Sequence, residues 1–178
     1  MRRTVAIIGT AIFFVFVPCV LAGLVPWWIS RWEFRLSFLG VELDDVVFEL
    51  ASKNLRIAGL GIDLRHDSYQ HGLQSLGRPG EDLLIVFVSP PWGHALSERS
   101  GLDLRRTQPP VAEAVDITTA AIGHHKLLFA IHVYETVEPD SLAEVTARFP
   151  WSAMRVYDIN APRPSPGLLL ATWGWVVP

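Results

Sequence analysis

The sequence predicts an α/β fold that follows an apolar N-terminal segment, and three observations support this. Residues 4–30 contain no charged side chain. From residue 35 onward, apolar runs of strand length alternate with stretches of helical periodicity. This second part also holds 12 basic and 17 acidic residues, which suit a water-exposed surface. We therefore divide the chain into a hydrophobic membrane segment, 1–34, and an α/β domain, 35–178.

The overall composition excludes several classes of protein. The chain has 178 residues and a formal net charge of -3, so bulk positive charge cannot be its main means of binding nucleic acid. Its single cysteine, Cys19, excludes a disulfide framework and a cysteine-based metal cluster. The length suffices for one hydrophobic core.

The N-terminal segment has the length and flanks of a membrane helix. As a continuous helix, its 27 uncharged residues would rise about 40 Å, more than the roughly 30 Å of a bilayer core. Trp27, Trp28 and Trp32 cluster at its far end, where indoles favour the interface. We expect residues 4–30 to anchor the chain in a membrane. A signal peptide cleaved after Ala22 and a buried strand at residues 4–10 are the alternatives.

The first half of the domain reads as strand, helix, strand, short helix and strand. A buried strand is expected at 36–43, and Asp44 or Asp45 can cap a helix that Gly59 ends. The next three elements are a strand at 61–65, a short helix within 68–77 and a strand at 83–88. The last of these, LLIVFV, is the most uniformly apolar run of the domain.

The second half continues the alternation. A loop extends to Pro109 and Pro110, and the expected elements after it are a helix at 111–123, a strand at 127–134, a helix at 141–149 and strands at 154–159 and 168–176. This order predicts a parallel sheet with helices on both faces. The last two strands have no helix between them and should form an antiparallel hairpin at one edge of the sheet.

The sequence Ser89-Pro90-Pro91-Trp92 directly follows the strand at 83–88. Ligands of open α/β sheets bind beyond the carboxyl ends of the strands, where this sequence would lie. The prolines fix the backbone, so the Ser89 and Pro90 carbonyls and the Ser89 hydroxyl become oriented hydrogen-bond acceptors. Trp92 can stack on a planar ring, and the alternative for it is simple core packing at the end of a strand.

This motif resembles the (Asp/Asn/Ser)-Pro-Pro-(Tyr/Phe/Trp) signature of class I S-adenosylmethionine-dependent methyltransferases that modify amino groups of nucleobases. The longer string IVFVSPPWG is most similar to the cap trimethylguanosine synthase group, and the similarity extends from Gly40 to Pro178. The resemblance implies a Rossmann-like sheet, S-adenosyl-L-methionine as cofactor and an RNA or other nucleobase substrate. It also implies catalytic and substrate-positioning roles for Ser89, Pro90, Pro91 and Trp92.

The same resemblance implies further site residues. Glu42, which ends the strand at 36–43, looks like the acid that binds the ribose hydroxyls of the cofactor, and Asp67 like the acid near its adenine. Apart from the resemblance, the position of His94, Arg105 and Arg106 on the loop after the motif makes them candidates for binding the substrate, and the alternative for the two arginines is a solvated loop. The six histidines show no recognised ligand spacing, so we expect no metal site.

The family also has a first strand and a glycine-rich loop, and no such sequence precedes Glu42. We therefore expect a partial methyltransferase domain without its first strand, its activity compromised by the missing loop. A non-enzymatic, membrane-anchored α/β remnant is the main alternative. Residues 9–32 resemble isoprenylcysteine carboxyl methyltransferase-like membrane proteins, which implies a membrane protein carboxyl methyltransferase as a third reading.

The cofactor is made in the cytosol, so we expect the domain on the cytoplasmic side of the membrane. If the leader is not inserted, we expect the domain in the cytoplasm. Arg2 and Arg3 weakly favour the opposite topology.

Overall fold

A computed structural model provides the structure, which describes residues 38–74, 76, 83–97, 99–157 and 165–175. The predicted membrane segment and the expected absence of a first strand and glycine-rich loop concern residues outside these ranges. Within them, no helix is both long and apolar enough to cross a bilayer.

The described strands are β1 (Leu39–Glu42), β2 (Asp63–His66), β3 (Leu83–Val88), β4 (Leu96–Ser97), β5 (Gly101–Leu102), β6 (Lys126–Tyr134), β7 (Trp151–Val156) and β8 (Pro166–Trp173). The described helices are α2 (Asp45–Ala58), α3 (Tyr69–Gln74), a 3-10 turn (Gly93–Ala95), α4 (Val111–Ile122) and α5 (Pro139–Thr146).

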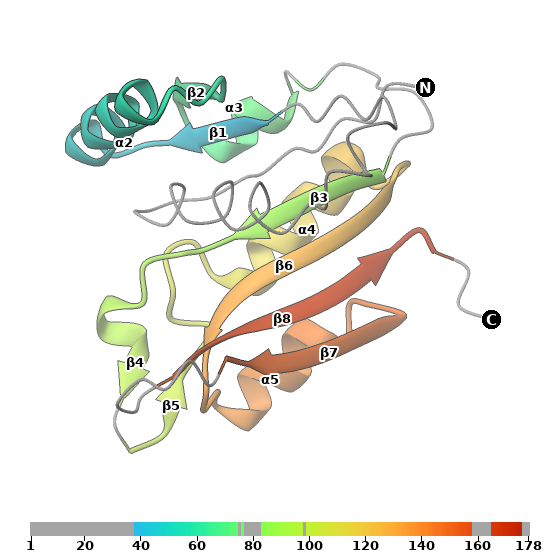
Figure 1. The fold of residues 1–178 in the computed structure, drawn as a ribbon. Coiled ribbons are helices and arrows are strands. Elements are labelled where there is room, and N and C mark those ends of the chain that lie inside the picture. Colours follow the sequence, from blue (N-terminus) through green and yellow to red (C-terminus); the bar gives the residue numbers. More distant parts are fainter. Residues whose placement is uncertain (1–37, 75, 77–82, 98, 158–164, 176–178) are drawn as a thin grey trace, which may run out of the picture.

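The main sheet has four strands in the order β3-β6-β8-β7 (Figure 1). β3 and β6 are parallel, whereas β8 runs antiparallel to both β6 and β7. The last two strands therefore form the expected antiparallel pair at one edge. β8 lies between β6 and β7, so the mixed sheet keeps its C-terminal strand inside.

Two smaller sheets complete the described fold. β1 and β2 form a parallel pair in which Glu42 lies opposite His66, so their carboxyl ends coincide. Helix α3 contacts β1 and also α4, and it thereby joins this pair to the helical layer of the main sheet. The two-residue strands β4 and β5, within a loop that the sequence leaves irregular, form an antiparallel pair.

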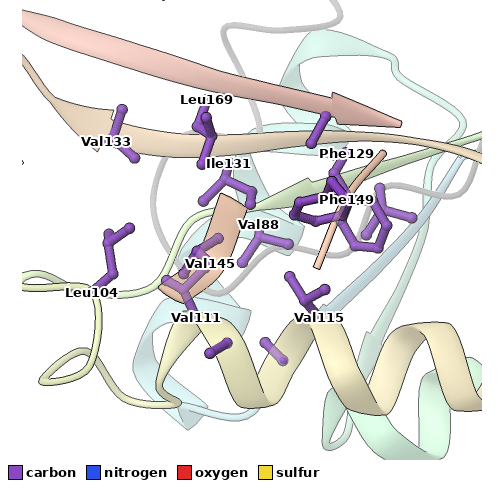
Figure 2. Close-up of a cluster of buried hydrophobic side chains, with 14 of the residues drawn as sticks. Val88, Leu104, Val111, Val115, Phe129, Ile131, Val133, Val145, Phe149 and Leu169 are labelled. Carbon is purple, nitrogen blue, oxygen red and sulfur yellow. The ribbon is translucent and has the colours of Figure 1, made fainter. Parts of the chain in front are cut away.

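The hydrophobic core fills the space between the main sheet and helices α4 and α5 (Figure 2). Alternate residues of the strands point into it, so that along β6 every second side chain from Leu127 to Val133 is buried. Phe129 is completely buried, and its ring centroid lies 5.1 Å from that of Phe149. The described helices that pack on the main sheet, α4 and α5, both cover this same face. For these helices, the sequence prediction that helices cover both faces of the sheet is wrong.

The predicted limits of α2 are confirmed by its capping groups. The Asp44 carboxylate accepts a hydrogen bond from the Val47 N–H at 2.9 Å, which satisfies one free donor of the first turn. Gly59 follows the helix with φ at 65°, a left-handed conformation that glycine adopts without strain.

The position of β7 differs most from the sequence prediction. The strand covers 151–156 rather than 154–159, because Trp151 pairs with Thr172 of β8 and Val156 with Gly167. As an edge strand, β7 takes its limits from its register with its one partner. Its own apolar residues, which include the exposed Val156, constrain these limits little.

Replacing Gly72 with alanine is expected to destabilise the fold by about 1–3 kcal/mol, because α3 packs directly against β1 at this residue. A Cβ at Gly72 would lie 2.5 Å from Cγ2 of the buried Val41. Urea unfolding of this variant and of Gly61→Ala, where an added Cβ meets nothing within 4 Å, measures the difference. Equal midpoints for the two variants would contradict the close packing of α3 on β1.

Candidate active site at the carboxyl ends of the strands

The Ser89–Trp92 motif leaves the main sheet at the carboxyl end of β3. Ser89 is only 4% exposed and Pro90 is buried, whereas Pro91 is exposed and Trp92 is half-buried. The Trp92 carbonyl accepts a hydrogen bond from the Ala95 N–H, and Gly93 takes a φ of 40°, so the chain turns sharply after the tryptophan. The motif thus lies at the end of a buried strand, as its sequence predicts.

Ser89 points to the face of the sheet opposite to α4 and α5. Residues 84, 86 and 88 of β3 enter the core beneath these helices, so the alternation places Ser89 on the other face. Val88 of β3 pairs with Ile131 of β6, so the next residue of β6, His132, lies at the level of Ser89. Ser89 Oγ is hydrogen-bonded to Nδ1 of His132 at 3.2 Å.

Trp92 belongs to the same cluster of side chains. Its ring centroid lies 4.7 Å from that of His132, with the planes tilted by 33°, and 5.8 Å from that of Tyr134 in an edge-to-face contact. Its indole Nε1 is buried, and it donates a hydrogen bond to no described residue. Burial lowers the pKa of His132 below its ordinary value of 6.5, so the imidazole is neutral at pH 7. Ser89, Trp92, His132 and Tyr134 form what we call the β3–β6 cluster.

His132 belongs to this cluster although it lies outside the Ser89–Trp92 motif. The available signal is a titratable side chain inside the otherwise apolar strand LLFAIHVY, two positions before its last residue. The pairing of β6 with β3 brings His132 next to Ser89. The sequence alone does not show that these two strands pair.

The two acids predicted to bind the cofactor are neighbours. Glu42 ends β1 and Asp67 directly follows β2, and the Asp67 N–H donates to the Glu42 carbonyl at 3.1 Å. The Glu42 side chain is 7% exposed, and its Oε1 accepts from the N–H groups of Leu43 and Asp44, both at 2.9 Å. Both acids therefore lie at the carboxyl ends of the β1–β2 pair.

The Asp67 carboxylate is held in its ionised form. Its Oδ1 accepts a hydrogen bond from the Ser68 N–H at 2.7 Å and lies 3.1 Å from His71 Nδ1. The bond from the Ser68 N–H, with a smaller effect of His71, lowers the pKa of Asp67 below 3.8. At neutral pH, this side chain can only accept hydrogen bonds.

Besides Trp92, the residues predicted to bind substrate lie beyond the motif. His94 is exposed in the 3-10 turn, and Arg106 is exposed after β5. The Arg105 guanidinium contacts Asp103 at 2.9 Å and Glu138 at 2.8 Å, so it ties the loop to the start of α5. Among the described residues, no three His, Cys, Asp or Glu side chains gather in a way that could hold a metal ion.

Comparisons with known proteins extend these observations. No protein-family model and no curated protein matches the sequence. Among solved structures, the METTL16 MTase domain is similar with a TM-score of 0.62 at 16% identity, covering 96% of this chain and 60% of that one. The human METTL16 N-terminal domain in complex with SAH gives a TM-score of 0.58 at 15% identity, with 99% and 63% covered. M. capricolum TrmK in complex with S-adenosyl-homocysteine gives 0.51 at 10% identity, with 98% and 64% covered.

The fold is therefore α/β, with a mixed sheet that resembles those of Rossmann-like methyltransferases. The chain spans about 60% of the length of the first of these structures.

Proposed function

We propose that this chain transfers a methyl group from S-adenosylmethionine to an amino nitrogen of a nucleobase in RNA. The observation that carries the proposal is the β3–β6 cluster, in which a buried serine and a half-buried tryptophan follow a buried parallel strand. The similarity of the fold to solved methyltransferases supports it. The resemblance of the motif to that of enzymes acting on nucleobase amines supports this class of substrate.

The residues at the ends of β1 and β2 fit the nucleoside part of this cofactor. Ribose hydroxyls and the adenine amino group are hydrogen-bond donors, and ionised carboxylates are strong acceptors for them. Glu42 ends β1 and Asp67 directly follows the neighbouring strand β2, and a hydrogen bond between their backbones links the two carboxyl-bearing residues. We assign Glu42 to the ribose and Asp67 to the adenine.

In the proposed reaction, Ser89, Pro90 and Trp92 orient the substrate. The Ser89 hydroxyl and the Pro90 carbonyl accept hydrogen bonds from the amino group, so its lone pair points away from them. A bound cofactor would supply an electrophilic methyl group on its sulfonium for the amino nitrogen, and its sulfur would keep the electron pair of the C–S bond. The amino group then loses a proton to water. Trp92 holds the base by stacking, a contact worth about 1–3 kcal/mol per base.

Calorimetry and a transfer assay test the proposal together. We expect the full chain to bind S-adenosylmethionine and S-adenosylhomocysteine. We also expect it to transfer labelled methyl groups to single-stranded RNA that contains adenine, cytosine and guanine. Poly(U) is the matched control, since uracil carries no exocyclic amino group. Failure to bind either nucleoside would favour the non-enzymatic remnant, for which the packing of Trp92 on His132 and Tyr134 would be structural only.

Replacing Trp92 with alanine is expected to raise KM for RNA by roughly 10- to 100-fold, because the base loses its stacking partner. Trp92→Phe keeps an aromatic face and should retain most of the activity. The control is Trp151→Ala, which removes an exposed tryptophan from the edge strand β7. An unchanged KM in Trp92→Ala, with the fold intact by circular dichroism, would contradict the stacking role.

A further inference from the structure

The Ser89 hydroxyl differs from a carboxylate or an amide carbonyl in one chemical respect. It can accept hydrogen bonds from a substrate amine, but its own proton is also a hydrogen-bond donor. If that proton points at the amine, the two groups repel each other. A serine in this position therefore needs a nearby acceptor that takes its proton away from the substrate.

The structure provides an acceptor in the correct place. His132 Nδ1 lies 3.2 Å from Ser89 Oγ, within hydrogen-bonding distance. His132 lies on β6 and Ser89 directly follows its parallel neighbour β3, and the alternation of both strands places the two residues on the sheet face opposite to α4 and α5. Because Ser89 directly follows Val88, the last residue of β3 that pairs with β6, the parallel pairing of these strands brings Ser89 beside His132.

We propose that His132 is a positioning residue that acts through Ser89. The neutral imidazole, protonated at Nε2, accepts the Ser89 hydroxyl proton at Nδ1. The hydroxyl proton then points away from the substrate, and Ser89 Oγ acts as an acceptor toward its amino group. The ring contact between His132 and Trp92 couples the position of the hydroxyl to the position of the stacking indole. This inference rests on the proposed function.

The protonation state of the imidazole agrees with this role. A charged imidazolium would donate from Nδ1 to Ser89 Oγ, occupy one lone pair and turn the hydroxyl proton toward the substrate. Burial lowers the pKa of His132, which keeps the ring neutral at pH 7.

The first test does not depend on activity. Nitrogen-15 NMR of the histidine rings in the full chain reads the tautomer of His132. We expect Nε2 to be protonated and Nδ1 to have the shift of a hydrogen-bonded acceptor. Ser89→Ala should move only the Nδ1 shift of this ring toward that of a free acceptor. Protonation at Nδ1, or no response to Ser89→Ala, would overturn the inference.

The second test measures methyl transfer to RNA by two contrasting variants. His132→Phe keeps a ring beside Trp92 but removes the acceptor, and we expect kcat to fall about 10-fold with KM for the cofactor unchanged. His132→Asn restores an acceptor near the Nδ1 position, and we expect kcat within about 3-fold of the parent. His124→Phe, which replaces an exposed histidine in the turn before β6, is the matched control.

A double substitution separates positioning from a structural role. If His132 acts through Ser89, His132→Phe should have no further effect on kcat in the Ser89→Ala background. Independent, additive losses would overturn the inference. A wild-type chain that methylates no RNA would refute the proposed function instead, and the NMR experiment would still decide whether His132 takes the serine proton.

Discussion

Replacing Phe129 with alanine is expected to lower the free energy of unfolding by about 3–5 kcal/mol, a large fraction of the stability of a domain of this size. Phe129 is completely buried on the central strand β6, between Val86 of β3 and Ala171 of β8 in the register. Its ring also packs on Phe149, which follows α5. Alanine would leave a cavity where two strands and a helical segment meet, and the rigid sheet cannot collapse to fill it.

Urea unfolding, followed by circular dichroism, measures this effect. Leu128→Ala is the matched control, because Leu128 is the next residue on the same strand and points to the half-exposed face. We expect the control to lose clearly less stability than Phe129→Ala. Similar losses in the two variants would mean that the helices do not define the main core.

Replacing Glu42 with glutamine is expected to weaken the binding of S-adenosylmethionine by roughly 10- to 100-fold. Hydrogen bonds to a charged acceptor are worth about 1.5–3 kcal/mol each, and the glutamine nitrogen cannot accept from a ribose hydroxyl. The substitution is mild toward the fold. The amide oxygen can still accept from the Leu43 and Asp44 N–H groups that now bind Oε1.

Calorimetry with S-adenosylmethionine and S-adenosylhomocysteine measures this change. Glu49→Gln removes an exposed carboxylate of α2 and controls for the loss of one negative charge. Wild-type affinity in Glu42→Gln would remove Glu42 from the cofactor site. It would leave open only a structural role as an acceptor at the start of α2.

Part of the candidate site can be predicted from the sequence, and part of it cannot. The position of Ser89–Trp92 at the end of a strand, and of Glu42 and Asp67 at the ends of two others, follows from the sequence, because apolar runs mark strands and polar residues mark their ends. The contact of Ser89 with His132 does not follow, because it joins residues that are 43 positions apart. The ion pairs that hold Arg105 to Asp103 and Glu138 are likewise invisible in the sequence.

The sequence by itself determined which of the longer segments become strands and helices and where α2 begins and ends, because periodicity, an acid before a helix and a glycine after it act locally. Only the tertiary structure decided that β8 lies between β6 and β7, that α4 and α5 share one face and that His132 reaches Ser89. The physical reason is that these features depend on strand pairing between distant segments. Local propensity is nearly the same for each possible partner, and the burial of the whole core selects among them.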